Sequence, residues 1–579
     1  MKKNLLSAFL LPLLALVSCC GPKDGTYRLQ LFTTNDVHGR YFDSLYVGSG
    51  TRQSLYAVSH YVDSVRKADG PENVILVDAG DCLQGDNAAY YFNYIDTLAP
   101  HLYARMANYM KYDAVAVGNH DVETGHPVYD RVAQQLDMPF MAANAIRNDN
   151  GRPYFADYTI VRKNGLKVAV LGFTNPNMKN WLSEDLWYGM HFESLLPLVQ
   201  QDVDKVIAKE HPHVVVVAVH SGTGEGDGSM LESQGLDLYN TLKGVDFLVC
   251  SHDHRPVVYE KSGICLINSG SHCRNIGHGV ISLEVKDGKV VSKELSADLI
   301  PVRKEAVDTV MRNVFRKDFE TVKAFTVKPV GTLVRDMKTR DAYKGMCDYM
   351  NLLHTLNLSC SPAEISFAAP LTFNGSIGAG TLVYNDLFTI YPFENQLFVV
   401  EMTGKEIKDY LEYSYDTWIN TVTGKAGEHV LRISNEPDPR TGQRRWSFLG
   451  RAYNFDSAGG LVYTVDVTKP DGSRVEIASL ADGTPFDMSA KYNVAMTSYR
   501  ASGGGAIMRE GAGIDTDNIG TRVVAKYPEI RNILYDYLTA GGSIDPSLVG
   551  DPSVIGHWEF IPEKLAGRML EKDMELLFD

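Results

Sequence analysis

The stretch DAVAVGNHDVE, from Asp113 to Glu123, joins an apolar run to a tip with an amide, an imidazole and two carboxylates within five residues. An uninterrupted apolar run predicts a strand that is covered on both faces, as in layered α/β domains. Polar groups at the end of such a strand lie where open α/β sheets place their sites. The stretch therefore predicts an α/β domain that carries its chemistry at the strand ends.

The same order of apolar run and polar tip recurs from about residue 28 to residue 300. The other runs are RLQLFTT (28–34), NVILVDAG (73–80), KVAVLGF (167–173), HVVVVAVH (213–220), DFLVCSH (246–252) and ICLINSG (264–270). Between the runs, residues 54–68 and 195–209 carry apolar side chains at helical spacing, which predicts helices that cover the strands. The repetition extends the α/β prediction to the whole N-terminal half.

Candidate metal ligands lie at the tips of five of these strands. They are Asp36, His38, Asp81, Asn119, His220, His252 and His254. Singly, an Asp in a turn is commonly a helix cap and a lone His is more often structural, but coincidence at successive tips favours a site. Imidazole, carboxylate and amide ligands suit Zn, Mn, Co or Fe better than Ca or Mg. The set can hold two ions bridged by one carboxylate, which is the arrangement of two-metal phosphate hydrolases.

Composition narrows the possible partners. The 579 residues are 44% hydrophobic and 22% charged, as in a globular protein, and the formal net charge is −15. A nucleic-acid polymer is disfavoured as partner because binding a phosphate backbone requires clustered Lys and Arg. An anionic small molecule would need a local positive focus such as bound metal ions.

The N-terminus, MKKNLLSAFLLPLLALVSCC, has the layout of an export signal, and no later segment is long and apolar enough to span a membrane. The string LVSC, Leu16 to Cys19, resembles the lipobox of bacterial lipoproteins, with a plain secretory signal as the alternative. Residues 1–25 are therefore expected to be signal peptide and tether. We predict an exported monomer, lipid-anchored through Cys19 on the periplasmic side or at the cell surface.

In their order, the motifs D-x-H, G-D, G-N-H-[DE], H and H-x-H resemble those of calcineurin-like metallophosphoesterases. With the C-terminal half included, the chain resembles the bacterial 5′-nucleotidase and 2′,3′-cyclic-nucleotide 2′-phosphodiesterase/3′-nucleotidase family. The resemblance implies a four-layer β-sandwich flanked by helices over 26–300, a linker helix and hinge over 301–326, and a smaller α+β substrate-binding domain over 327–579. It also implies one ion on Asp36, His38 and His254, a second on Asn119, His220 and His252, and Asp81 as the bridge.

The residues after Asn119 are expected to act on the substrate. The resemblance implies that His120 stabilises the transition state or protonates the leaving oxygen. Glu123 stands where many relatives place an Asp that orients this histidine, and Asp121 competes for the same role. Helix capping is the alternative for both carboxylates.

The C-terminal half is expected to choose the substrate. Residues 367–380 and 388–407 resemble nucleotide-domain segments, and Asn374 is a predicted substrate contact. The stretch NGSIGAG, which begins at Asn374, lacks the arginine that many 5′-nucleotidases carry after this Asn-Gly turn. Residues 452–468 and 498–507 look more like the cyclic-phosphodiesterase branch, in which two aromatic rings sandwich the base. Tyr453 and Tyr499 are the predicted pair, with Phe455 as alternate for the first and core packing as the alternative role for each. Arg500 is expected to contact phosphate or sugar.

These expectations favour an extracytoplasmic two-metal phosphoesterase that hydrolyses 2′,3′-cyclic and 3′-nucleotides by in-line attack of a metal-bound hydroxide. A broad 5′-nucleotidase or nucleotide-sugar hydrolase is the alternative within the same class. A surface lipoprotein that only binds nucleotide or a host ligand is a third possibility. It is disfavoured because all seven ligand positions and His120 hold competent residues.

Overall fold

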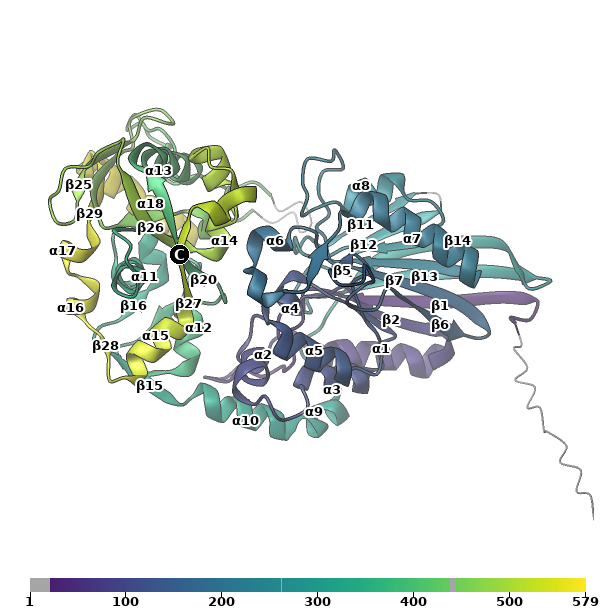
Figure 1. Ribbon diagram of the computed structural model, residues 1–579. Helices are drawn as coiled ribbons and strands as arrows, with labels where there is room; N and C mark the ends of the chain where they lie inside the picture. The colour runs from purple at the N-terminus through teal and green to yellow at the C-terminus, as the bar shows by residue number, and fades with distance from the viewer. Residues whose placement is uncertain (1–20, 262, 438–443, 579) are drawn as a thin grey trace, which may run out of the picture.

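The computed structural model describes residues 21–261, 263–437 and 444–578, which form two domains joined by a helical segment (Figure 1). The predicted cleavage and lipid-attachment site at Cys19 lies outside the described residues. Within the described ranges, no helix is long and apolar enough to cross a membrane. The six cysteines after Cys20 are all free thiols.

Two six-stranded sheets face each other in the N-terminal domain. The first has the order β14-β13-β1-β2-β3-β4 and the second β11-β12-β10-β9-β7-β6. The strands of the first sheet are β1 (Gly25–Thr34), β2 (Val74–Asp78), β3 (Ala114–Ala116), β4 (Phe140–Met141), β13 (Asn275–Lys286) and β14 (Lys289–Pro301). Those of the second are β6 (Tyr158–Lys163), β7 (Leu166–Phe173), β9 (Val214–Val219), β10 (Phe247–Val249), β11 (Val257–Lys261) and β12 (Ile264–Asn268). The central strands of both sheets are parallel, and β13, β14, β6 and β11 are antiparallel additions at the edges.

Strand β9 shows why the apolar runs are uninterrupted. Its residues Val214 and Val216 lie in the core between the two sheets, whereas Val215 and Val217 lie in the core under the outer helices. The covering helices are α7 (Leu195–Glu210) and α8 (Gly235–Thr241) on this sheet and α1 (Leu55–Asp69), α3 (Leu102–Met110) and α5 (His126–Gln135) on the other. The four-layer sandwich is confirmed.

The C-terminal domain is α+β, as expected. Its five-stranded sheet has the order β23-β17-β26-β20-β27, with only the pair β17 and β26 parallel. The strands are β17 (Ile365–Ala368), β20 (Gln396–Thr403), β23 (Ser457–Gly459), β26 (Lys491–Thr497) and β27 (Val523–Glu529). Helices α11 (Asp348–Ser359) and α13 (Gly404–Trp418) pack on this sheet, and α18 (Glu563–Phe578) closes the chain.

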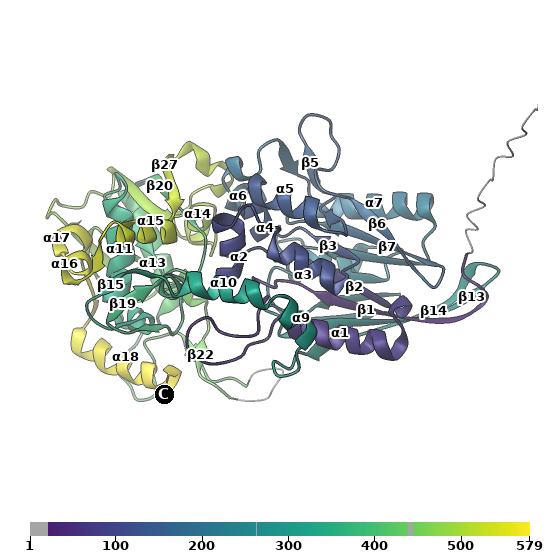
Figure 2. The same cartoon turned by 90° about the horizontal axis from the view of Figure 1, so that it is seen from below.

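The segment expected to be a hinge is anchored to the N-terminal domain. It forms α9 (Thr309–Val314) and α10 (Arg316–Thr326), which run beside α1, α2 (Asn87–Tyr90) and α3 in both views (Figures 1 and 2). Met311, Phe315 and Val322 belong to the core of that domain. Because these side chains are buried, free movement along 301–326 is not supported. Only Val327 and Lys328 separate α10 from β15 (Pro329–Leu333), the first strand of the next domain.

The two domains also touch through Tyr90 at the end of α2. Its ring belongs to a core cluster of the C-terminal domain, and its hydroxyl donates to Asn532 Oδ1 at 2.9 Å. The guanidinium of Arg531 lies over the rings of Tyr90 and Phe388, 5.1 Å and 4.0 Å from the centroids. These contacts bring α15 (Ile530–Thr539) of the C-terminal domain next to the N-terminal domain.

Candidate metal centre and substrate face

The strand-tip residues converge on two adjacent groups. Asp36, His38 and His254 form one, and Asp81, His220 and His252 form the other; within each group the candidate ligand atoms lie within 4.8 Å of one another. Asn119 Oδ1 lies 3.0 Å from His220 Nε2 and 2.9 Å from His252 Nδ1, which places it with the second group. All seven predicted ligands are therefore at the centre.

The backbone is strained at most of these positions. Five of the seven predicted ligands have left-handed φ values between 47° and 69°: Asp36, His38, Asp81, His252 and His254. Only a few per cent of residues other than glycine adopt this conformation, although Asn, Asp and His do so more often than the rest, and it costs of order 1 kcal/mol or more per residue. Such strain concentrates at functional sites, where the surrounding structure holds it in place.

Close packing requires glycine at position 118, the first residue of the stretch GNHDVE. An added Cβ at Gly118 would lie 2.1 Å from Asp81 Oδ1, a distance no side chain tolerates. The same carboxylate oxygen accepts a hydrogen bond from the backbone N–H of His120 at 2.8 Å. The glycine thus lets the loop of Asn119 and the loop of Asp81 approach closely enough to share one site.

The donor set fits divalent cations. The Nε2 atoms of His38 and His254 face each other at 3.0 Å, and His220 Nε2 lies 3.1 Å from Asp81 Oδ2. Although burial alone would raise it, the imidazoles of His220 and His120 hold the pKa of Asp81 well below its usual range. Convergent imidazole and carboxylate groups of this kind suit Zn, Mn, Co or Fe.

Hydrogen bonds behind the ligands fix their orientation. His220 Nδ1 lies 2.8 Å from the carbonyl of Ala79, and Ser251 Oγ lies 3.0 Å from the same nitrogen. His38 Nδ1 is 3.0 Å from Gln84 Oε1. Donation from Nδ1 to these oxygens would leave Nε2 free to bind a cation, as is usual for metal-binding histidines whose other ring nitrogen donates to an oxygen.

His120 is paired with Glu123 and not with Asp121. His120 Nδ1 lies 2.5 Å from Glu123 Oε2. Burial disfavours the imidazolium, but the carboxylates of Glu123 and Asp81 outweigh it and raise the pKa of His120 to about 10. A protonated His120 held in this way can donate to a phosphoryl oxygen or to a leaving group.

Asp121, expected as a competing partner of the histidine, has another role. Its carboxylate accepts hydrogen bonds from four backbone N–H groups, those of Gly118, Asp81, Cys82 and Leu83, at 2.8 to 3.0 Å. These bonds consume both oxygens and tie the 81–83 loop to α4 (Asn119–Glu123). The expectation of a catalytic Asp121 is therefore corrected: this carboxylate stabilises the loops by accepting backbone hydrogen bonds.

The predicted tyrosine Tyr499 lies on the side of the C-terminal domain that faces the N-terminal domain. Tyr499 is in α14 (Ser498–Ala501), which lies opposite α6 (Met178–Trp181) of the N-terminal domain (Figures 1 and 2). Burial raises the pKa of Tyr499 to about 12, with smaller contributions from nearby Tyr453 and from Glu232 of the other domain. Tyr453 is 38% exposed. Charges of both domains therefore act on the Tyr499 hydroxyl.

Two other predicted substrate contacts are corrected. Arg500 is buried, and its guanidinium donates to Asp456 through Nε at 2.9 Å and Nη2 at 2.7 Å and to the carbonyl of Tyr453 at 3.1 Å. It holds the tyrosine loop instead of facing a ligand. Phe455 is 1% exposed and stacks on Trp418 with centroids 5.4 Å apart, so it is a core residue.

The glycines after Tyr499 leave room for a side chain of the protein itself, the ring of Tyr499. An added Cβ at Gly504 would lie 2.4 Å from the Tyr499 ring, so this close approach is to the tyrosine and not to a ligand. Asn374 is exposed in the turn after β17, next to Phe373, which packs on Phe578 at the end of α18. No described contact links Asn374 to the metal groups or to the tyrosines.

Several residues at the centre were not singled out from the sequence. Trp181 stacks on His252 with centroids 5.1 Å apart, and His272 lies beside the rings of His38 and His254. Gln84 and Ser251 are three residues or fewer from predicted ligands, so proximity to the motifs could have indicated them. Trp181 and His272 lie in segments without a ligand pattern, and only the three-dimensional fold places them beside the candidate ligands.

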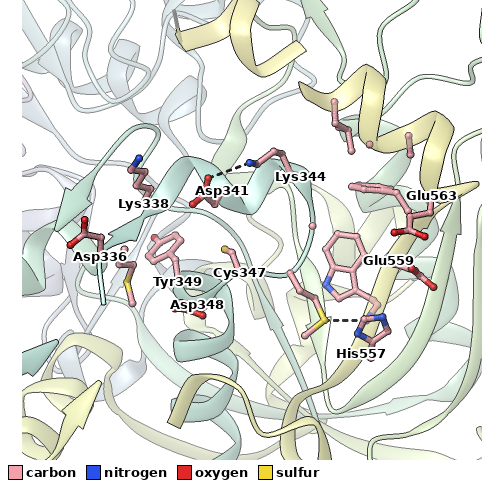
Figure 3. A pocket seen from close by; sticks show the side chains of 18 residues that line it. Asp336, Lys338, Asp341, Lys344, Cys347, Asp348, Tyr349, His557, Glu559 and Glu563 are labelled. Atoms are coloured by element: carbon pink, nitrogen blue, oxygen red, sulfur yellow. Dashed lines mark hydrogen bonds and ion pairs between the residues drawn. The ribbon is translucent and has the colours of Figure 1, made fainter. Parts of the chain in front are cut away.

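A cavity of about 590 Å³ lies elsewhere, wholly within the C-terminal domain (Figure 3). Figure 3 shows carboxylates around it, among them Asp341, which pairs with Lys344 at 3.6 Å. None of the residues predicted from the sequence lines it. The metal centre therefore remains the candidate functional site.

Comparison with protein families separates the chain into the same two parts. Residues 30–256 match calcineurin-like phosphoesterases, and residues 323–510 match the 5′-nucleotidase C-terminal domain. The first match contains nearly all of the strand tips described above, including all seven candidate ligands. The second contains both tyrosines.

Several known proteins resemble this chain over most of its length. A trifunctional nucleotide phosphoesterase of Bacillus subtilis is 25% identical in an alignment of 583 positions, which covers 90% of this chain but only 38% of that protein. A 2′,3′-cyclic-nucleotide 2′-phosphodiesterase/3′-nucleotidase of Salmonella typhimurium is 23% identical over 85% of this chain and 84% of that enzyme. A solved structure from Staphylococcus aureus, described as a 5′-nucleotidase, has the same fold, with a TM-score of 0.74, 22% identity, and coverage of 92% of this chain and 99% of that one.

Proposed function

Because the chain belongs to the metallophosphoesterase and 5′-nucleotidase family, whose members are nucleotide phosphohydrolases, we propose that it hydrolyses 2′,3′-cyclic nucleotides and 3′-nucleotides. The substrate preference is supported by the likeness to the Salmonella enzyme over both domains. The absence of an arginine after Asn374 and Gly375 is consistent with it. The buried Arg500 does not replace that arginine.

The observation that carries the proposal is the convergence of the two ligand groups beside His120. Two divalent ions held by these groups would supply a water of lowered pKa and neutralise the charge of the phosphoryl group. His120, protonated and held by Glu123, would donate a proton to the leaving oxygen or stabilise the charge on phosphorus. The aromatic faces of Tyr453 and Tyr499 would hold the base, which is worth about 1 to 3 kcal/mol per stacked base.

Turnover assays on the purified chain test this proposal. With added Mn or Zn, the protein should open 2′,3′-cAMP and release phosphate from 3′-AMP with a higher kcat/KM than it shows for 5′-AMP or UDP-glucose. Chelation should abolish all four activities, and metal should restore them. A preference for 5′-AMP or UDP-glucose would contradict the proposed substrate class while leaving the metal centre intact.

A broad 5′-nucleotidase is the second candidate. The observation in its favour is the match of residues 323–510 to the 5′-nucleotidase C-terminal domain. The same four-substrate comparison separates the two functions, because both need the same metal centre and differ only in the sugar position of the phosphate. One assay therefore decides between them.

We also propose that the protein is exported and anchored by a lipid on Cys19. The supporting observation is the string LVSC after an apolar segment with two preceding lysines. Metabolic labelling with a radioactive fatty acid should mark the wild-type chain and not Cys19→Ser. Labelling of both would exclude Cys19 as the attachment site.

A further inference from the structure

A second cavity, of about 270 Å³, lies where the two domains meet near the metal centre. Arg40, Arg52 and Asn87 line it from the N-terminal domain, and Asn385 and Thr389 line it from α12 (Tyr384–Ile390) of the C-terminal domain. The remaining lining residues are Leu45, Tyr46, Val47, Gly85, Asp86 and Phe388. The cavity is therefore polar and belongs to both domains.

The cavity shares a wall with the first ligand loop. Arg40 follows the ligand His38 by two residues, so their Cα atoms are at most about 7 Å apart. An added Cβ at Gly85, another lining residue, would lie 2.9 Å from His38 Cβ. A group bound in the cavity would thus be a neighbour of the metal centre.

In the described part of the chain, both arginines of the cavity have guanidinium N–H groups without a hydrogen-bond partner. Among the described residues, no hydrogen bond or ion pair is recorded for the guanidinium of Arg40. Arg52 pairs with Asp86 through Nη1 at 2.7 Å, but its buried Nη2 has no partner within the described part of the chain. Arg40, Arg52 and Asp86 are the charged residues that line the cavity, and two guanidinium groups with one carboxylate leave a net positive charge.

The C-terminal domain adds neutral polar groups. Asn87 Nδ2 donates to Asn385 Oδ1 at 3.0 Å, which leaves the Asn385 amide N–H groups free to donate, and Thr389 adds a hydroxyl. Guanidinium, amide and hydroxyl donors around a confined polar space are the groups that bind phosphate. An acceptor-rich anion would satisfy donors from both domains at once.

We propose that this cavity binds a phosphate group, which is either free inorganic phosphate or a second phosphate of the nucleotide substrate. Arg40 is the principal contact, and Asn385 and Thr389 complete the site from the other domain. Occupation of the site would hold the domains in the arrangement described here. The second source rests on the function proposed above, whereas binding of inorganic phosphate does not.

Calorimetric titration of the Mn-loaded full-length protein with inorganic phosphate tests the site directly. Wild type should show two binding events, one at the metal centre and one in the cavity. Arg40→Gln should lose or weaken one event by about tenfold or more, the effect expected for a charge-assisted hydrogen bond. Arg274→Gln is the matched control, because Arg274 is an exposed arginine near Arg40 that does not line the cavity.

A kinetic comparison then distinguishes the two sources. If the site takes a substrate phosphate, Arg40→Gln should raise KM for adenosine 3′,5′-bisphosphate about tenfold and leave KM for 3′-AMP within about twofold. If only the calorimetric event is lost, the ligand is inorganic phosphate. A single event in wild type, or two unchanged events in Arg40→Gln with an unchanged Tm, would overturn the proposal. If the wild-type protein shows no turnover but Arg40→Gln still loses one phosphate-binding event, the result contradicts the proposed enzymatic function and leaves the phosphate site standing.

Discussion

The metal centre and the tyrosine face are built in opposite ways. All seven candidate ligands follow closely after strands of the sandwich, and five have left-handed backbone conformations held by the loops around them. The tyrosine face is an irregular loop and one turn of helix, in which Tyr453 is 38% exposed and a buried arginine supplies the support. The first region is rigid and defined by short motifs. The second is defined by contacts between residues far apart in the chain.

The contrast indicates which kinetic property a substitution in each region should change. At the metal centre every side chain has a neighbour that fixes its direction, so small changes should have large effects on catalysis. On the tyrosine face, single rings are proposed to stack on the base, so changes there should alter KM by moderate factors. The following tests run from the largest expected effect to the smallest.

Asp81→Ala should lower kcat/KM for 2′,3′-cAMP by more than about a thousandfold, because it removes the carboxylate expected to bridge two ions. Metal analysis by mass spectrometry should show that fewer than two ions remain bound. Asp227→Ala, at an exposed loop position, is the control and should retain full activity. Full activity in Asp81→Ala would refute the two-ion assignment.

Glu123→Gln should lower kcat about ten- to a hundredfold with metal content unchanged, because it weakens the partner that holds His120. Asp121→Asn should instead lower Tm, because an amide oxygen cannot replace two carboxylate oxygens that accept four backbone N–H bonds. Turnover and thermal melting, measured on both variants, separate the roles. Equal effects of the two variants on kcat at unchanged Tm would contradict the separation.

Tyr499→Ala should raise KM for the nucleotide about tenfold, as expected for the loss of one stacked base, while Tyr499→Phe should change it little. Phe455→Ala should lower Tm without a comparable change in KM, because the ring packs on Trp418 in the core. Steady-state kinetics and melting curves measure both quantities. A large rise in KM for Phe455→Ala with unchanged Tm would restore Phe455 as a base contact.

The smallest effect is expected at the domain contact, through Glu529. Burial raises the pKa of Glu529 from its ordinary 4.5 to about 8, so the folded protein holds this proton more tightly than the unfolded chain. The stabilisation is complete at low pH and is lost progressively as the pH rises from 4.5 to about 8. Glu529→Gln keeps a neutral side chain, so its Tm relative to wild type should rise by several °C between acidic and mildly alkaline pH. A pH-independent difference would show that Glu529 does not titrate in this range.

The sequence predicted the four-layer sandwich because apolar runs with polar ends depend only on residues next to each other in the chain. It also named the seven residues that meet at the centre, for the same reason. It did not separate Glu123 from Asp121, since both lie in the same turn and only the fold shows which one reaches the imidazole. Phe455 and Arg500 were misjudged because their partners, Trp418 and Asp456, are recognised only in three dimensions. Trp181 and His272 were missed because neither the short helix α6, which holds Trp181, nor the loop of His272 carries a ligand motif.

The docked linker limits how the two domains can move apart. With α10 fixed to the N-terminal domain, three Cα-to-Cα steps from Thr326 to Pro329 provide the only covalent connection, a reach of at most about 11 Å. Such a short tether permits rotation about one point but no wide separation. A rotation displaces distant residues in proportion to their distance from the pivot, so a modest turn at Val327 would move Tyr499 much farther than it moves β15.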